Sequence, residues 1–414
     1  MTLPSEPLRL EDVDGTMTKP APRRSPAQDD PGARAEVMAY YFPQWHRDPR
    51  NDDMLGDGWT EWDLLREATP RYPGHRQPKR PLWGETDESE PENASRAVSA
   101  ALDHGLTGFL VDWYWYDNQP FLNGFLDRGL LNAERLESFR FALMWANHDW
   151  TELYPAQHAN STVLLPAPNT RYHAEKAFDH ILAHYLGHPS YWTVDGAPYF
   201  SIYDLPGLIR GMGGVAETAS LLDKFRHRAQ DAGLLGLHLN GVLNPSVPNP
   251  ASLLTRLGFD SATHYTWWHH PDARYTFPTT EYQVAAEHAA VTWQRMADEL
   301  PVPYFPNVTV GWDPSPRTTP WPMDRDAGYP FTSILEGNTP ESYGQALSSA
   351  LELANKLPQP RAVTINAWNE WTEGSYLEPD TDHGYAYLKA TANAIAPTAT
   401  VADPTPSAHT SARR

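Results

Sequence analysis

The chain has 414 residues, a formal net charge of −20 and no cysteine. This length is enough for one large barrel or for two smaller domains. The acidic balance argues against nucleic acid or an anionic membrane as the main partner, and no run of 18 apolar residues is present to span a bilayer. Without cysteine, disulfides and thiolate metal sites are excluded.

Two terminal segments differ in composition from the rest of the chain. Residues 1–34 and 397–414 are rich in Pro, Asp, Arg and Ala and lack apolar periodicity, so both are predicted to be disordered tails. No apolar stretch follows Arg23 and Arg24, so no signal peptide is recognised and a cytoplasmic location is expected. Residues 35–396 contain no linker-like stretch and no internal repeat, which predicts a single catalytic domain.

Short β-rich runs alternate with helix-compatible runs within that domain. The expected strands are 37–42, 107–112, 139–145, 198–203, 237–243, 259–266, 304–311 and 362–369. The expected helices are 91–104, 120–136, 172–187, 214–233, 280–298 and 340–356. This order predicts an α/β fold, a single (β/α)8 TIM barrel with elaborated βα loops; a doubly wound open sheet is the alternative.

Aromatic residues are unusually frequent, with sixteen tryptophans and twenty tyrosines. Most aromatic side chains in proteins belong to the core. Here, however, many adjoin Asp, Asn, His or Glu, as in "DWYWYDN", "MWANHDW" and "HYTWWHH". Flat rings beside hydrogen-bonding groups suit a sugar, whose C–H faces stack while its hydroxyls need partners. The pattern therefore predicts carbohydrate binding.

The ends of the predicted strands supply the candidate substrate-binding residues, because active sites of such barrels gather at the C-terminal strand ends. In strand order the candidates are Tyr41, Gln44, Asp112, Trp113, Trp145, Asn147, His148, Asp149, Tyr203, His264, Trp268, Trp312, Trp368 and Asn369. Trp59, Glu61 and Trp62 in "GWTEW" are expected to form a subsite in the first loop. His264, His269 and His270 lack the separated spacing of a zinc site, so no metal is predicted.

The eighth strand, "AVTINAWNEW" (362–371), alternates between two faces. The apolar set, expected to face the helices, is Val363, Ile365 and Ala367. The other set, expected to face the barrel axis, is Thr364, Asn366, Trp368 and Glu370. Glu373 follows Glu370 by one helical turn, so the two carboxylates can converge on one pocket. The alternative is that Glu373 caps a helix or pairs with an arginine.

Two carboxylates flanking one site meet the requirement of glycoside hydrolysis, one as acid and one as base or nucleophile. Neighbouring carboxylates also push their pKa values apart, so one of them can hold a proton at neutral pH. The residues alone do not assign the proton to Glu370 or to Glu373.

The segment "NAWNEWTEGSYLEPD" (366–380) resembles the signature of the WbsX-like family, which belongs with glycoside hydrolase family 99, the endo-α-mannosidases and mannanases. Similar stretches are "YYFPQWH", "GWTEWDLLREATPRYPGHRQPKRP", "TGFLVDWYW" and "FALMWANHDWT", in the expected order over residues 37–388. The resemblance implies a (β/α)8 fold and a retaining mechanism. It implies that Glu370 deprotonates the sugar 2-hydroxyl, whose oxygen attacks the anomeric carbon to give a 1,2-anhydro sugar, while Glu373 protonates the leaving oxygen. Glu370 and Glu373 are therefore the predicted catalytic pair, and we expect Glu373 to be protonated beside an ionised Glu370. A direct glycosyl-enzyme at Glu370 is the alternative route.

Two departures from the family pattern fall in the expected subsites. "ANHDW" stands where related chains commonly read "ANENW", and "DWYW" stands where they often read "YHYW". Mannose specificity is therefore not carried over. The prediction is a glycoside hydrolase acting on an α-linked oligo- or polysaccharide, without a cofactor. The alternatives are a glycosyltransferase of surface polysaccharide synthesis and a non-catalytic sugar-binding barrel.

Overall fold

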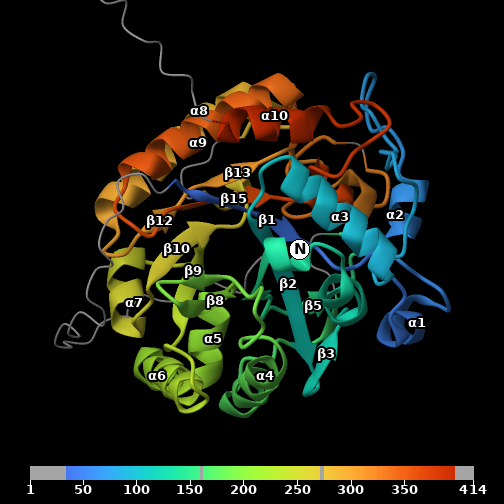
Figure 1. The fold of residues 1–414 in the computed structure, drawn as a ribbon. Coiled ribbons are helices and arrows are strands. Elements are labelled where there is room, and N and C mark those ends of the chain that lie inside the picture. The colour runs from blue at the N-terminus through green and yellow to red at the C-terminus, as the bar shows by residue number, and fades with distance from the viewer. Residues whose placement is uncertain (1–33, 159–161, 271–274, 322, 397–414) are drawn as a thin grey trace, which may run out of the picture.

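The computed structural model describes residues 34–158, 162–270, 275–321 and 323–396, and the structural statements below refer to these ranges. Apart from Arg34, the two expected tails lie outside them. Within the described chain, a parallel sheet closes into a barrel that is surrounded by helices (Figure 1).

The strands pair in the order β12-β10-β9-β8-β4-β2-β1-β15-β13, and every neighbouring pair on this path is parallel. Their bounds are β1 (Glu36–Tyr41), β2 (Gly108–Tyr116), β4 (Arg140–Trp145), β8 (Ala197–Ile202), β9 (His238–Leu243), β10 (Ser261–His264), β12 (Tyr304–Phe305), β13 (Asn307–Thr309) and β15 (Ala362–Asn366). All eight expected strand positions are occupied, which confirms the (β/α)8 barrel over the open sheet.

The seventh strand is split rather than continuous. Strand β12 pairs with β10, whereas β13 pairs with β15, and Pro306 lies between them. Proline has no backbone N–H to donate to a ladder, which favours an interruption at that residue. Its carbonyl still accepts the N–H of Thr364 at 2.9 Å. The split strand closes the barrel because its two halves bond to opposite neighbours.

Ten α-helices are assigned in the described chain. They are α1 (Pro49–Leu55), α2 (Trp62–Glu67), α3 (Pro91–Asp103), α4 (Arg171–His184), α5 (Leu205–Met212), α6 (Val215–Asp231), α7 (Pro250–Leu257), α8 (Tyr282–Glu299), α9 (Pro340–Lys356) and α10 (Ala386–Ile395). Local sequence signals explain where α9 begins. The helix follows Thr339, which forms a capping box with Ser342, and Pro340 occupies its first position. No helix in the described ranges combines the length and hydropathy needed to cross a bilayer.

The expected helix over 120–136 is wrong. Strand β2 instead turns back into β3 (Gln119–Phe121), and a π-turn (Phe125–Gly129) and a short 3-10 turn (Leu130–Asn132) follow. The hairpin turns at Asp117 and Asn118, which have φ values of 51° and 60°. Asp and Asn tolerate this left-handed conformation, so a two-residue hairpin turn is favoured there over helix.

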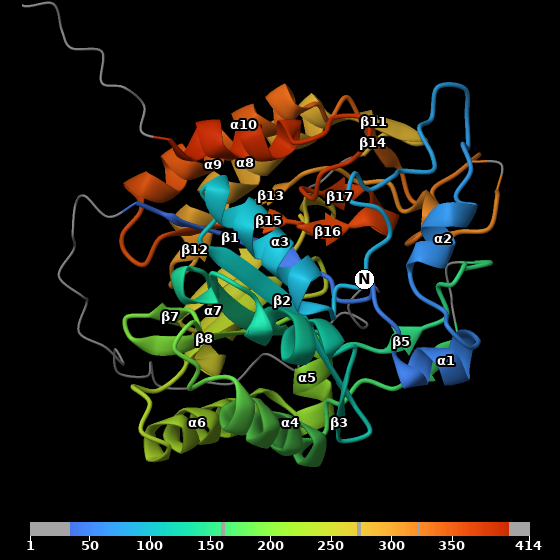
Figure 2. The same ribbon diagram turned by 45° about the vertical axis from the view of Figure 1, so that its right-hand side comes forward.

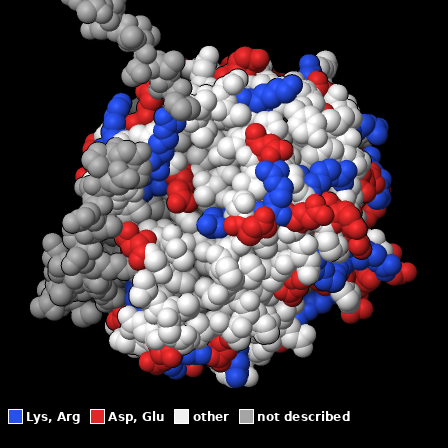
Figure 3. Space-filling view, viewed as in Figure 1, with Lys and Arg blue, Asp and Glu red and all other residues white. Residues whose placement is uncertain are grey.

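The connections that follow the strands gather at one end of the barrel. Figure 2 shows α1, α2, the short strand β5 (Trp150–Thr151) and the hairpin of β16 (Asn369–Glu370) and β17 (Ser375–Tyr376) at the same side of the molecule. Each follows the C-terminal end of a barrel strand. On the face seen in Figure 3, acidic and basic side chains are interspersed rather than separated by sign.

Alternation along the strands separates the barrel interior from the layer under the helices. Thr364 lies inside, where its hydroxyl contacts Thr263 Oγ1 and Asn307 Nδ2 at 3.1 Å each. Gly241 lies on the outer face, because a Cβ there would meet Leu254 and Leu205 of the surrounding helices. Only side chains on the inner face of the strands can therefore reach the mouth of the barrel.

Candidate active site

The segment after β15 places two glutamates at the mouth. Glu370 ends β16, a 3-10 turn covers Trp371–Glu373, and β17 pairs back onto β16. The turn ends at Gly374 with φ 64°, and a Cβ there would come within 2.7 Å of Asp313 Cβ, so glycine is required on both grounds. A helical turn thus separates Glu370 from Glu373, as the spacing predicted.

Arg317 binds both glutamates from the loop after β13. Its Nη2 donates to Glu370 Oε2 at 3.1 Å, and its Nη1 donates to Glu373 Oε1 at 2.6 Å. Its Nε donates to Glu61 Oε1 at 3.1 Å, and its guanidinium lies 5.2 Å from the Phe42 ring centroid. Arg317 is 2% exposed. One buried cation therefore holds three carboxylates. Glu373 does pair with an arginine, which was the alternative considered for it from the sequence.

Two tyrosines complete the hydrogen bonds of the pair. Tyr329 Oη donates to Glu373 Oε1 at 2.7 Å. Tyr265 Oη lies 3.0 Å from both Asp112 Oδ2 and Glu370 Oε1. A single phenolic proton cannot serve two carboxylates at once. At least one of Asp112 and Glu370 must therefore be protonated for both contacts to be hydrogen bonds.

Burial and mutual repulsion set the protonation of these acids. Burial, and then the neighbouring Glu373, raise the pKa of Glu370 to about 7. Burial and then Glu370 raise the pKa of Asp112 well above its ordinary value. Burial also acts to raise the pKa of Glu373, whereas Arg317 and the hydrogen bond from Tyr329 act to lower it. Burial and the repulsion between the two carboxylates favour a single proton on the pair, and the expectation that Glu373 carries it stays a prediction.

Several predicted residues lie near this carboxylate network. Burial raises the pKa of the Tyr203 phenol, and the nearby carboxylates of Glu373, Asp112 and Glu370 raise it further. The Tyr203 ring lies 5.4 Å from the ring of His148. Burial lowers the pKa of His148 to about 4, so this imidazole is neutral.

The first loop adds a second group beside the same network. Glu61 accepts the hydroxyl of Thr372 at 2.6 Å in addition to Arg317. Trp59 packs edge-on against Tyr154, with ring centroids 5.0 Å apart, and Tyr154 has Glu61 and Arg317 among its charged neighbours. Gln44 is fully buried beside Tyr154, and its carbonyl accepts the Glu61 N–H at 3.3 Å. This loop therefore brings three predicted residues, Gln44, Trp59 and Glu61, to the mouth.

Two further tryptophans stack on one another at the rim. The rings of Trp268 and Trp312 are 5.5 Å apart and nearly parallel, at 8°. Trp268 also stacks on Tyr275 at 4.2 Å, and Trp312 Nε1 donates to Thr332 Oγ1 at 3.0 Å. Trp268 is partly exposed, so part of this stack faces solvent.

Five predicted residues instead lie in the layer between the barrel and its helices. Tyr41 stacks on Phe125 at 3.6 Å, Trp113 stacks on Trp115 and His180, and the register of β2 and β4 places Trp145 beside Trp113 on the same face. His264 Nδ1 is bonded to Tyr304 Oη at 2.7 Å, and Arg295 of α8 is among its charged neighbours. Trp368 contacts Phe109 and Trp83 rather than the axis. The expectation that these side chains line the pocket is not met, because each falls on the outward face.

The remaining predicted residues hold loops together. Asn147 bonds the backbone N–H and carbonyl of Asp204, and Asn369 bonds the backbone N–H and carbonyl of Phe42. Asp149 Oδ1 accepts the N–H of Ala167 at 2.7 Å. Trp62 packs on Trp45 and donates its Nε1 hydrogen to the Thr86 carbonyl. In this geometry their side chains support the site rather than face it.

Comparison with known proteins places the chain in a family. The model of the family described as "Glycosyltransferase WbsX" matches residues 37–391. The chain belongs to the WbsX family. Two curated relatives, each described as "Uncharacterized protein WxcX", come from Xanthomonas campestris pv. campestris, strains B100 and ATCC 33913. They are 29% and 28% identical over 379 residues. The match covers 87% of this chain and 50% of each relative, so the chain spans about half their length.

Solved structures share the fold of this WbsX family member. The GH99 endo-α-mannosidase from Bacteroides thetaiotaomicron, in complex with bis-tris-propane, is 16% identical with a TM-score of 0.57. That match covers 87% of this chain and 96% of the other. A structure named "Glycoside hydrolase-like protein" is 14% identical with a TM-score of 0.59, covering 89% and 96%. At these identities the likeness establishes a common barrel fold.

Sequence reasoning missed Arg317, Tyr265 and Tyr329. Arg317 lies in the proline-rich stretch "DPSPRTTP" (313–320), which has neither apolar periodicity nor a recognised motif. Tyr265 lies inside "HYTWWHH", where the neighbouring tryptophan and histidines were chosen instead. The parity rule would have found Tyr265, because it shares the inward face with Thr263. No local signal marks Tyr329.

The rim position of Trp59 gives a binding prediction for this WbsX family member. Trp59→Ala should weaken saccharide binding by about 1–3 kcal/mol, because a stacking surface at the mouth is removed. Trp113→Phe is the matched control, since Trp113 packs under the helices, and saccharide binding should be unchanged. Titration calorimetry with an oligosaccharide checks both variants. Equal losses in both would contradict the placement of Trp59 at the mouth.

Proposed function

We propose that the protein is a retaining glycoside hydrolase that cleaves an α-linked oligo- or polysaccharide with Glu370 and Glu373. The observation that carries this proposal is the sharing of one buried guanidinium by the two carboxylates. Held on neighbouring nitrogens of Arg317, the two carboxylates can act as base and acid on one glycosidic bond. Membership of the WbsX family and the barrel shared with a GH99 structure agree with a saccharide substrate.

Unpaired polar atoms at the mouth support a polyhydroxylated ligand. Asp112 Oδ1, Tyr114 Oη and both polar atoms of the Asn366 amide are buried without a hydrogen-bond partner among the described residues. Buried polar groups without partners are costly, so a ligand that supplies hydroxyls would stabilise them. Asp112 and Tyr114 share one strand, and Asp112 adjoins Glu370 through Tyr265. The unpaired atoms therefore surround the proposed reaction centre.

The reaction needs one proton on the glutamate pair. We propose the route implied by the family resemblance, in which Glu370 removes the proton of the sugar 2-hydroxyl and O2 attacks the anomeric carbon. Glu373 gives its proton to the leaving oxygen, and water then opens the anhydro sugar with both transfers reversed. For this route the shared proton must lie on Glu373 when the substrate is bound. A substrate without the 2-hydroxyl distinguishes this route from direct attack by Glu370.

The shared proton predicts how activity depends on pH. The singly protonated pair is the active form whichever glutamate carries the proton, because the two arrangements have the same pH dependence. The upper pKa belongs to Glu370 at about 7. As pH rises through about 7 the pair loses its only acid, so kcat/KM should fall. As pH falls far enough to protonate both carboxylates the pair loses its base, so kcat/KM should fall there as well. A rate profile that rises steadily from pH 6 to 9 would contradict the assignment.

The description of the family as "Glycosyltransferase WbsX" favours a glycosyltransferase as the second candidate. A direct comparison separates the two: the protein is incubated with α-linked aryl glycosides and oligosaccharides in one series and with sugar nucleotides plus acceptors in another. Release of reducing sugar without a nucleotide supports the hydrolase. Transfer that occurs only from a sugar nucleotide overturns it. Binding without turnover in either series would leave a non-catalytic carbohydrate-binding barrel.

A further inference from the structure

A pocket of about 310 Å³ is lined by Gly374, the residue after Glu373, but by none of the side chains of the carboxylate network. Its size is at the lower end of the range for small-molecule sites. Gly374 lines it, whereas the Glu373 carboxylate is bound to Arg317. Its walls come from the first-loop segment 72–79, from residues 310–313 and 334–339 around β13 and β14 (Ile334–Glu336), and from residues 374–387. The roles proposed above leave this pocket unused.

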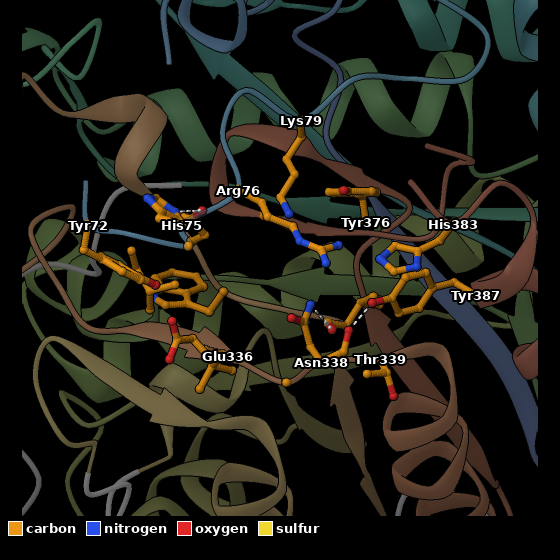
Figure 4. A pocket seen from close by; sticks show the side chains of 18 residues that line it. Tyr72, His75, Arg76, Lys79, Glu336, Asn338, Thr339, Tyr376, His383 and Tyr387 are labelled. Atoms are coloured by element: carbon orange, nitrogen blue, oxygen red, sulfur yellow. Dashed lines mark hydrogen bonds and ion pairs between the residues drawn. The ribbon is translucent and has the colours of Figure 1, made fainter. Parts of the chain in front are cut away.

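Two cations enter the pocket from the same wall. Figure 4 shows Arg76 and Lys79 reaching into it from one side, with Glu336 and Asn338 opposite. The Lys79 ammonium has no hydrogen-bond or ion-pair partner among the described residues. Arg76 has Asp382 at 3.9 Å, and both side chains are about half exposed or more, so this pair is weak. In a protein of net charge −20, two poorly compensated cations in one pocket point to an anionic ligand.

The other charged residues of the pocket do not cancel these cations. Asp313 is already bound by His75 Nε2 at 2.8 Å and by Gln77 Nε2 at 2.7 Å, and these contacts fix the loop that carries Arg76 and Lys79. Glu336 is therefore the remaining carboxylate, and it lies on the wall opposite the cations (Figure 4). The pocket thus has a cationic wall and an acceptor wall.

The acceptor wall and the aromatic lining suit a sugar ring. Glu336 can accept hydroxyl donors, and Asn338 uses only its Nδ2, in a weak contact of 3.3 Å with the Val310 carbonyl. Tyr72 and Tyr387 lie towards opposite ends of the cavity in Figure 4. A molecule with a carboxylate at one end and hydroxyls at the other matches this arrangement, and aromatic rings can pack on its C–H faces.

We propose that this pocket is an accessory subsite for an acidic sugar unit, with the sugar carboxylate at Arg76 and Lys79 and its hydroxyls at Glu336 and Asn338. The site deepens the proposed function and rests on it only in taking a saccharide as the ligand class. It predicts that the natural saccharide carries a uronic acid or a similarly charged sugar. Binding at this site needs no turnover, so it can be measured independently of hydrolysis.

The test is titration of the full chain with D-glucuronate, D-glucose and inorganic sulfate at low ionic strength, followed by NMR or calorimetry. Glucuronate should bind at least about tenfold more tightly than either other probe, which corresponds to about 1.4 kcal/mol. The double variant Arg76→Met/Lys79→Met should lose this preference. Lys389→Met removes one exposed cation on α10 and should keep the preference for glucuronate. Turnover of an uncharged aryl α-glycoside should be unaltered in the double variant.

Three outcomes would overturn the proposal. Equal binding of glucose and glucuronate would exclude a charge-selective subsite. Sulfate binding as tight as that of glucuronate would reduce the site to one for any small anion. Unchanged glucuronate binding in the double variant would place the acidic sugar elsewhere. Because glucuronate binding does not require cleavage, absent hydrolysis with intact selective binding would count against the hydrolase proposal alone.

Discussion

Glu370→Gln is expected to reduce kcat/KM by about 10²–10⁴-fold on activated and unactivated α-glycosides alike. The amide cannot remove the proton of the 2-hydroxyl and cannot attack the anomeric carbon, so both retaining routes are lost. Steady-state kinetics with a dinitrophenyl and an alkyl α-glycoside measures the effect. Circular dichroism checks the fold, which should persist because glutamine can keep the contact with Tyr265.

Glu378→Gln is the matched control. Glu378 lies in the same segment, is partly buried, has a pKa raised by burial to about 7, and accepts the Trp371 Nε1 hydrogen at 2.8 Å. It is outside the carboxylate network, so its amide should leave kcat/KM near the wild-type value. Near wild-type turnover in Glu370→Gln would refute the catalytic pair.

Glu373→Gln separates the two roles. If Glu373 supplies the leaving-group proton, its amide should abolish cleavage of the alkyl glycoside but spare the dinitrophenyl glycoside, whose leaving group needs little protonation. The raised pKa of Glu370 makes the reverse assignment a specific rival. In that case Glu370→Gln, and not Glu373→Gln, would retain activity on the dinitrophenyl substrate.

The barrel was predictable from sequence because its strands carry strong local signals. Apolar, β-rich runs bounded by polar strand ends located all eight positions. The errors lie where local patterns are ambiguous. The apolar spacing of Phe121, Phe125 and Leu130 is compatible with a helix, but the positive φ values of Asp117 and Asn118 turn the chain into a hairpin first. Tertiary context decided between the two.

Parity located inward side chains only within the barrel strand itself, as for Thr364 in β15. Glu370 lies beyond the end of β15 and reaches the network through the β16–β17 hairpin, not through the alternation that singled it out. Trp113 and His264 were chosen because they end strands, and a shift of one residue puts a side chain on the opposite face. Trp368 fails for another reason: β15 ends at Asn366, so the alternation does not continue to it. Arg317 could not be located from sequence, because only the folded loop brings it to the glutamates.

Arg317→Met should lower the free energy of unfolding by about 3–5 kcal/mol at pH 7, because removal of a buried cation leaves its carboxylate partners uncompensated. Arg317 binds three glutamates and is 2% exposed. Arg66→Met is the control: Arg66 also pairs with two acids, but its side chain is 50% exposed. Exposed pairs contribute about 0.2–1 kcal/mol, so urea unfolding should distinguish the variants clearly.

The pH dependence of the Arg317 effect tests its cause. Arg317 lowers the pKa of Glu373 in the folded state, after burial has acted to raise it. A lowered carboxyl pKa contributes stability that is present above the unfolded pKa, near 4.3, and lost as pH falls through the folded value. The gap between wild type and Arg317→Met should therefore be largest near neutral pH and shrink below about pH 4. A gap that stays constant from pH 7 to pH 3.5 would mean that Arg317 stabilises the fold by packing, for example on Phe42, and not by its charge.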